Sequence, residues 1–116
     1  MNKTESLKKT YQFGHVYNEG ISRANKNLVM YVLDNESDSN RLGISVSKKV
    51  GNSVVRHHMC RLIREVYRLH ENMFNSGLDI VVVVRKGSAK CSYKEIEDSM
   101  IHLAKLHNIY IEETND

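Results

Sequence analysis

The segment Asp79–Val84 (Asp-Ile-Val-Val-Val-Val) constrains the fold more than any other stretch of this chain. Its β-branched residues favour an extended strand, and a run that is apolar on both faces is typical of a strand buried on both sides. We therefore predict a central strand there. Further strands are predicted at Leu28–Leu33, a continuous apolar run, and at Arg41–Ser47, where apolar and small polar residues alternate. The turn-forming segment 34–40 between these two strands predicts that they form an antiparallel pair.

Apolar residues at helical spacing predict three helices, over residues 6–18, from Val54 to about His70, and after a capping-box pattern at Ser92–Glu95. Asn52 or Ser53 is expected to cap the middle helix. The order of elements predicts an α/β two-layer sandwich with a small mixed four-stranded sheet and three helices. The residues expected to face the core are Val55, Met59, Leu62, Ile63, Val66 and Leu69 in the middle helix, and Ile96, Met100, Leu103 and Leu106 in the last helix.

Length and composition exclude several classes of protein. The chain has 116 residues, of which 41% are hydrophobic and 27% charged, a balance typical of one soluble globular domain over residues 1–116. Cys60 and Cys91 provide neither a disulfide framework nor a metal-binding spacing. No apolar run approaches the roughly 20 residues of a membrane span, and no signal-peptide core follows the N-terminus. We expect a single domain in a reducing cytosol, not a membrane protein, a secreted miniprotein or a multidomain enzyme.

The basic residues are concentrated in one part of the chain. Residues 41–68 carry seven lysines and arginines against one acid, Glu65, whereas residues 95–116 carry six acids against Lys105 alone. Such a separation of charge steers polyanions to the positive region, although a mixed solvated surface is the simpler interpretation. The placement of the basic residues on the middle helix favours the first interpretation.

Four side chains of the middle helix fall nearly opposite its apolar stripe: His57, Arg61, Arg64 and Arg68. An ordinary exposed helix gains stability from Glu–Lys pairs one turn apart, but here Glu65 is the single carboxylate between residues 48 and 70. The arginine fork matches phosphate. Lys48 and Lys49 extend the same surface, and the helix N-terminus near Asn52 offers backbone N–H groups to a phosphate. This face is predicted to bind nucleic acid.

Aromatic residues form a second candidate site. Phe13 and Tyr17 share one face of the first helix, and Tyr31 lies on a predicted strand. The three rings could line a groove beside Ser45 and Ser47, where exposed rings stack on unpaired bases, or they could belong to the core. The residue pattern leaves both interpretations open.

No catalytic or metal-binding pattern is present in the sequence. The six histidines show no arrangement typical of a metal site, and no Ser/His/Asp or paired-carboxylate constellation can be identified. His57 and His58 are adjacent on a helix, so their rings diverge by about 100°. We predict that the chain is not a catalyst by itself and that no protein motif binds a cofactor.

The stretch Leu42–Glu65 resembles the signature of the bacterial ribonuclease P protein component, and the resemblance extends from about Ser6 to Ile111. It implies the accessory subunit of a ribonucleoprotein endonuclease (a hydrolase) that removes the 5′ leader from precursor tRNA in the bacterial cytoplasm. The partners implied are the ribonuclease P RNA subunit, which holds the active site and its Mg²⁺, and precursor tRNA. Neither a membrane nor a protein partner is evident. The resemblance also implies an uncommon left-handed β-α-β crossover.

Carried over by position, the resemblance assigns two surfaces. The surface for the RNA subunit comprises Lys48, Lys49, Asn52, Arg56, His57, His58, Arg61, Arg64 and Arg68. The cleft for the leader comprises Phe13, Tyr17, Tyr31, Ser45 and Ser47, with Lys49 near its edge. The family pattern Arg-Asn-Arg followed by Ile-Lys-Arg reads Arg56-His57-His58 followed by Met59-Cys60-Arg61 here, so two fixed charges are lost. The alternatives are a non-catalytic RNA-binding or ribosomal-type module of similar fold and a protein-only hydrolase.

Overall fold

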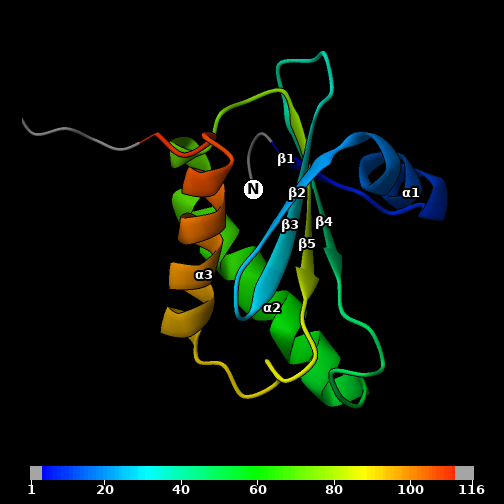
Figure 1. Ribbon diagram of the computed structural model, residues 1–116, viewed down its shortest axis with the longest axis vertical. Helices are drawn as coiled ribbons and strands as arrows, with labels where there is room; N and C mark the ends of the chain where they lie inside the picture. The colour runs from blue at the N-terminus through cyan, green and yellow to red at the C-terminus, as the bar shows by residue number, and fades with distance from the viewer. Residues whose placement is uncertain (1–3, 112–116) are drawn as a thin grey trace, which may run out of the picture.

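The computed structural model describes residues 4–111, which form five strands, three α-helices and one 3-10 helix. In chain order these are β1 (Thr4–Ser6), α1 (Thr10–Glu19), β2 (Ile21–Ala24), β3 (Leu28–Asp34), β4 (Asn40–Ser45), α2 (Ser53–His70), the 3-10 helix Glu71–Met73, β5 (Leu78–Val84) and α3 (Tyr93–Leu106). The strands form one mixed sheet in the order β1-β4-β5-β3-β2 (Figure 1). The predicted α/β sandwich with three helices and a mixed sheet is confirmed.

The apolar strand β5 is the central strand of this sheet, as predicted. It runs parallel to β4 and antiparallel to β3. The predicted antiparallel pair of β3 and β4 is therefore wrong, because β5 lies between them. A strand that is apolar on both faces gains most from a position with a hydrogen-bonded neighbour on each edge and cover on each side. The parallel β4–α2–β5 unit that the resemblance implies is present, and its left-handedness stays a prediction.

The sheet has five strands where four were predicted, since two short edge strands give little signal in the sequence. All four residues of β2 are exposed, so the strand shows no alternation of buried and exposed positions. β1 is three residues long and pairs in parallel with β4, and its last residue, Ser6, was predicted to begin a helix. Helix α1 begins at Thr10 rather than residue 6, because the side-chain oxygen of Gln12 accepts hydrogen bonds from the backbone N–H groups of Lys8 and Lys9, each at 2.9 Å.

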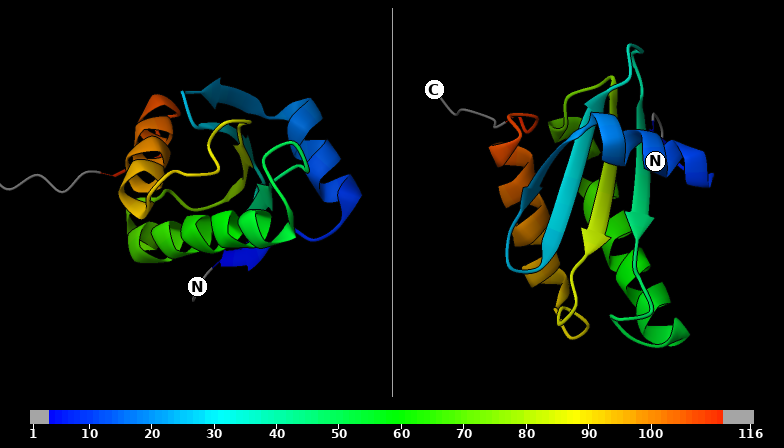
Figure 2. Two further views of the ribbon diagram at one scale, coloured as in Figure 1. Left: turned by 90° about the horizontal axis from the view of Figure 1, so that it is seen from below. Right: turned by 45° about the vertical axis from the view of Figure 1, so that its right-hand side comes forward.

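The helices cover the two faces of the sheet unequally. Helices α2 and α3 pack on one face and form the main core with Leu28, Met30, Ile80 and Val82. Helix α1 lies on the opposite face, where a smaller cluster contains Leu7, Val16 and Val81 (Figure 2). The main core lies between the sheet and helices α2 and α3, as the predicted sandwich requires. On the α1 side the cover is smaller, so a ligand can reach some side chains of the sheet there. No helix within residues 4–111 has the length and apolar character needed to cross a membrane.

The predicted buried stripe of α2 is right over most of its length and wrong at its end. Met59, Ile63 and Val66 are buried, but Leu69 is 57% exposed, and Tyr67, which was not among the predicted core residues, is fully buried. The stripe advances in steps of three and four residues, so His70, not Leu69, continues it. His70 is half-buried and joins the two helices, since its Nε2 donates to Glu97 at 2.9 Å and holds the pKa of that carboxyl below its ordinary value.

Helix α3 begins as predicted, but its last predicted core residue is exposed. Its predicted capping box is present, with Ser92 Oγ accepting from the backbone N–H of Glu95 at 3.2 Å and the carboxylate of Glu95 accepting from the N–H of Ser92 at 3.0 Å. Ile96, Met100 and Leu103 are buried as predicted, but Leu106 is 44% exposed. The half-buried His107 follows Leu106, donates from Nε2 to the carbonyl of Met30 at 2.8 Å, and has its pKa lowered by the burial of its ring.

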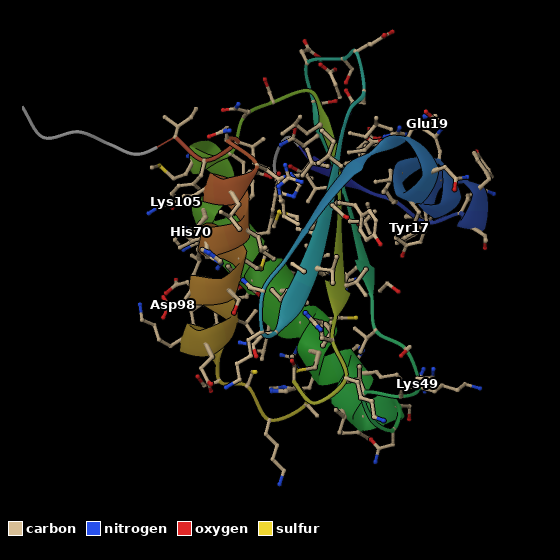
Figure 3. All side chains as sticks on the ribbon, viewed as in Figure 1. Tyr17, Glu19, Lys49, His70, Asp98 and Lys105 are labelled. Atoms are coloured by element: carbon tan, nitrogen blue, oxygen red, sulfur yellow. The ribbon has the colours of Figure 1, made fainter. Side chains whose placement is uncertain are left out.

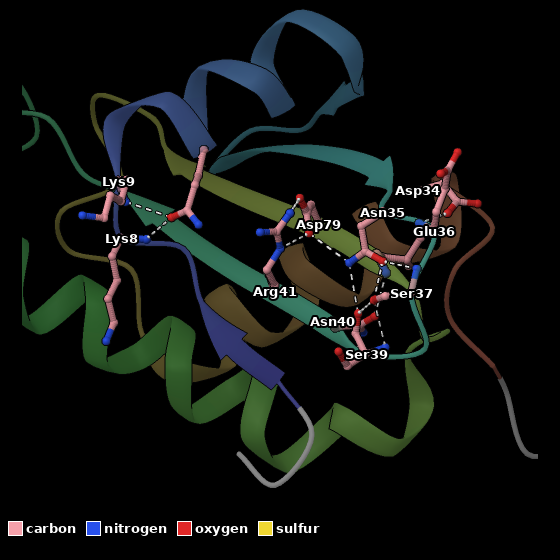
Figure 4. Close-up of polar contacts among 12 residues, drawn as sticks. Lys8, Lys9, Asp34, Asn35, Glu36, Ser37, Ser39, Asn40, Arg41 and Asp79 are labelled. Atoms are coloured by element: carbon pink, nitrogen blue, oxygen red, sulfur yellow. Dashed lines mark hydrogen bonds and ion pairs between the residues drawn. The ribbon is translucent and has the colours of Figure 1, made fainter.

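A polar network secures the end of the sheet at which β5 begins (Figure 4). Asp79 is 1% exposed and accepts from Arg41 Nε at 2.7 Å, from Arg41 Nη2 at 2.5 Å and from Asn35 Nδ2 at 3.0 Å. The Arg41 charge is thus neutralised inside the fold. Arg41 was counted in the basic segment 41–68, but it does not contribute to a free cationic surface.

Replacing Arg41 by methionine is expected to lower the free energy of unfolding by about 1–2 kcal/mol. Breaking a buried ion pair leaves a buried carboxylate uncompensated, and the solvent around the partly exposed arginine reduces that cost. Urea denaturation monitored by circular dichroism measures the loss. The double variant Arg41→Met with Asp79→Leu should recover part of the stability. Equal instability of the single and double variants would show that the carboxylate is not the cause.

Candidate nucleic-acid interface

The outer face of α2 carries the predicted row of cations, the α2 ridge, which comprises His57, Arg61, Arg64 and Arg68. All four side chains are exposed. Arg68 forms a two-point pair with Glu65, with Nε–Oε2 at 3.0 Å and Nη2–Oε1 at 2.5 Å, and its hydrogen bond holds the pKa of Glu65 below its ordinary value. Within residues 4–111, no carboxylate pairs with Arg61 or Arg64. Most of the ridge therefore lacks an internal counterion.

The first turn of α2 adds further predicted residues to this surface. Asn52 caps the helix, since its Oδ1 accepts from the backbone N–H of Val55 at 3.0 Å. One of the N–H groups expected to meet a phosphate is therefore already bonded. His58 is exposed, whereas Arg56 is half-buried and its Nε is buried without a hydrogen-bond partner among the described residues. Arg56 pairs with no carboxylate in that part of the chain.

Lys48 and Lys49 occupy the tight turn that joins β4 to α2, closed by a hydrogen bond from Val50 N to the carbonyl of Ser47 at 3.0 Å. Both lysines are exposed, and Figure 3 shows Lys49 at the end of the molecule where α2 begins. They therefore extend the α2 ridge, as predicted. The β4–β5 register, which pairs Ser45 with Val83, places the end of β5 beside this turn.

The same end of the molecule carries cations that the candidate site omitted. The exposed residues Lys26, Arg85, Lys86 and Lys90 lie in the β2–β3 turn and the β5–α3 loop. These two segments are joined by hydrogen bonds from Arg85 N to Asn27 O at 3.0 Å and from Arg85 Nη1 to Asn25 O at 2.8 Å. Lys26 is separated from the rest by many residues along the chain, so only the strand register brings it here. Lys94, the next lysine along the chain, pairs instead with Asp98 on α3 at 3.1 Å.

The predicted leader-cleft residues lie on or beside the α1 face of the sheet. Phe13, Tyr31 and Ser45 are half-buried, and Tyr17 and Ser47 are exposed. Three rings, those of Phe13, Tyr17 and Tyr31, form an aromatic row. The ring centroids of Phe13 and Tyr17 are 6.4 Å apart, and those of Tyr17 and Tyr31, which meet edge to face, are 4.9 Å apart. Phe13 and Tyr31 pack on the small cluster, whereas Tyr17, labelled in Figure 3, is 38% exposed.

The aromatic row lies close to the sheet because β4 has a glycine beneath it. A Cβ atom at Gly43 would lie 2.7 Å from Cε1 of Phe13, so a larger residue would push the ring away. Ser45 follows Gly43 on the same face of β4, and the β4–β5 register places it beside Val83. The row is therefore continued by small polar and aliphatic side chains that lead toward Lys49.

Within residues 4–111, no group of three or more His, Cys, Asp or Glu side chains is placed to hold a metal ion. His70 and His107 are occupied in structural hydrogen bonds, and His102 contacts Asn25 at 3.1 Å. Cys60 and Cys91 are free thiols. The two surfaces described above provide cations and stacking rings, which suit binding of a polyanion with unpaired bases.

Comparison with known proteins agrees with these features. A family model described as Ribonuclease P matches residues 1–107. The ribonuclease P protein component of Lachnoclostridium phytofermentans is 64% identical over 106 residues, 91% of each chain, and that of Clostridioides difficile is 46% identical over 111 residues, 95% of this chain and 97% of the relative.

Solved structures show the same similarity. The RNase P protein of Staphylococcus aureus superposes with a TM-score of 0.84 at 37% identity, covering 90% of this chain and 96% of the other. The RNase P protein of Thermotoga maritima gives 0.81 at 29% identity, covering 88% and 96%. The chain therefore belongs to the family of bacterial ribonuclease P proteins, the protein components of a tRNA-processing ribonucleoprotein.

Proposed function

We propose that this protein binds the catalytic RNA subunit of ribonuclease P through the α2 ridge and the 5′ leader of precursor tRNA through the aromatic row, and so assists endonucleolytic removal of the leader. The observation that carries the proposal is the pair of arginines, Arg61 and Arg64, that no carboxylate within residues 4–111 neutralises. Arginines without an internal partner match RNA phosphates in charge and geometry. In this proposal Mg²⁺ is held mainly by the RNA, as the family resemblance implies.

The two surfaces have separate tasks in this proposal. The α2 ridge faces away from the sheet and binds the folded RNA subunit. The aromatic row lies on the opposite face of the sheet, where bases of a single strand can stack on Tyr17 without being read by sequence. Lys49 lies in the turn between β4, which carries Ser45, and the start of α2. In this proposal a leader that leaves the row along β4 reaches the RNA bound to α2 at this turn. The protein orients the leader, and the RNA performs the hydrolysis.

Reconstitution tests the proposed function. The protein is added to a bacterial ribonuclease P RNA, and cleavage of precursor tRNA is measured at low Mg²⁺ concentration. Stimulated cleavage with a mature tRNA 5′ end supports the proposal. RNA binding without stimulation would favour a non-catalytic RNA-binding module, and cleavage that persists after nuclease treatment of the protein preparation would favour a protein-only hydrolase.

Replacing His58 by arginine is expected to strengthen binding of the RNA subunit. This exposed histidine stands where the family pattern has arginine, and arginine brings a fixed charge and a fork that matches phosphate. Filter binding of the two proteins at one salt concentration measures the gain. Equal or weaker binding by His58→Arg would contradict the prediction.

A further inference from the structure

A hollow of about 320 Å³ opens between α2 and α3 beside the α2 ridge. It is lined by His58, Arg61, Leu62 and Glu65 of α2 and by Tyr93 at the start of α3. The four α2 residues follow one another at spacings of three, one and three, so they form one continuous strip along the helix surface. We call this hollow the α2–α3 pocket. Its volume falls at the lower end of the range typical of sites for small ligands.

The lining of the α2–α3 pocket combines apolar and aromatic surface with charged side chains. Leu62 is half-buried, and the ring of Tyr93 supplies an aromatic surface of the kind on which bases stack. The Tyr93 hydroxyl is buried and lies within reach of the Glu97 carboxylate. Burial, and then the carboxylates of Glu97 and Glu65, raise the pKa of Tyr93, so the side chain is neutral and offers its ring rather than a charge.

Charge decides what the pocket accepts. Glu65 contributes the carboxylate, which Arg68 holds in place through two hydrogen bonds of 3.0 and 2.5 Å. The amino group of a base can donate to this carboxylate, whereas an ionised phosphate oxygen, which only accepts hydrogen bonds, cannot bond to it. His58 and Arg61 line the same pocket and supply cations for the phosphates on either side of an inserted nucleotide.

We propose that the α2–α3 pocket receives one unpaired nucleobase that carries an amino group, extruded from the RNA bound along the α2 ridge, with the base against Tyr93 and its amino group donating to Glu65. This inference rests on the proposed function, since the RNA that supplies the base is the one bound by α2. It adds recognition of a single nucleotide to a surface that otherwise reads only phosphate positions.

Mononucleotide binding tests the pocket directly. The protein is titrated with GMP, UMP and ribose 5-phosphate, and NMR resonances of Leu62 and Tyr93 are followed. GMP should shift both resonances, UMP should shift them less because it has no amino group, and ribose 5-phosphate should leave them in place. Equal shifts with ribose 5-phosphate, or none with GMP, would overturn the proposal, since the hollow would then be a phosphate site or no base site.

Chemical probing of the reconstituted holoenzyme tests the same pocket in the assembly. Wild-type protein should protect an unpaired nucleotide of the RNA, and Tyr93→Leu should expose that nucleotide and raise the Kd about 5- to 100-fold, the effect of one base–aromatic stack. Tyr93→Phe retains the ring and should retain the protection. Tyr11→Leu, the same change at a tyrosine that is 72% exposed on α1, is the matched control.

The outcomes separate the two proposals. If the wild-type protein does not bind the RNA at all, the proposed function fails. If it binds but Tyr93→Leu leaves every protection unchanged, only the nucleobase pocket fails. Melting temperatures of the variants show whether each is folded, and the mononucleotide titration of the wild-type protein needs no variant.

Discussion

Replacement of Arg61 and Arg64 together by alanine is expected to weaken binding of the RNA subunit by about 2–4 kcal/mol, or roughly 30- to 1000-fold in Kd. Both side chains are exposed and pair with no carboxylate within residues 4–111, so folding should be unaffected. With fewer phosphate contacts, binding releases fewer counterions from the RNA. The slope of log K against log salt should therefore flatten by about one to two units. Filter binding at several salt concentrations measures both quantities.

The matched control removes two positive charges elsewhere. Lys8 and Arg23 are exposed residues outside the α2 ridge, and their double alanine variant should change affinity far less. Arg61→Lys with Arg64→Lys keeps the charge and should restore most of the slope, with some affinity lost because lysine cannot offer the arginine fork. An unchanged slope in the alanine variant would mean that these residues do not contact phosphate.

Replacement of Tyr17 by alanine is expected to weaken binding of precursor tRNA to the holoenzyme about 5- to 100-fold, the effect of one base stacked on one ring. Tyr17 is the exposed member of the aromatic row, so its loss removes stacking surface with little effect on the core. Binding of mature tRNA, which has no leader, should be unchanged. Equilibrium binding of the two RNAs by the reconstituted holoenzyme gives the comparison.

Two further variants make this test specific. Tyr17→Phe preserves the ring and should bind precursor tRNA like the wild type. Tyr11→Ala removes a more exposed ring from the same helix, one that is outside the row, and should have no effect. An equal loss of affinity for mature tRNA in Tyr17→Ala would assign the residue to another part of the substrate.

The parts of the fold that follow from neighbouring residues were predictable from the sequence. The bounds of α2, its Asn52 cap and the capping box of α3 depend on residues within one turn of each other. The position of β5 followed from its apolar character alone. The pairing of β3 and β4 was predicted wrongly because the order of strands depends on contacts between segments far apart in the chain. The edge strand β2 has no buried residue and therefore no hydrophobic signal.

The candidate sites divide in the same way. The α2 ridge could be predicted because residues three and four apart on a helix share a face. By contrast, Lys26 and Tyr93 join the basic surface and the α2–α3 pocket only through tertiary structure. The helix stripes were predicted one residue off at their ends, since Leu69 and Leu106 are apolar but exposed, whereas His70 and His107 are half-buried. A histidine can be half-buried here because each finds a hydrogen-bond acceptor, Glu97 or the Met30 carbonyl.

The internal pairing of Arg41 with Asp79 has an effect beyond stability. It removes the free cation from the end of the sheet that also carries the exposed Asp34, Glu36 and Asp38, while the lysine-rich turns occupy the opposite end. The molecule, 42 Å in its longest dimension, is therefore an electric dipole. The field of a nearby polyanion rotates the protein before contact, so that its cationic end meets the polyanion first. This alignment makes more encounters productive, and it weakens once salt shortens the Debye length to about 10 Å or less.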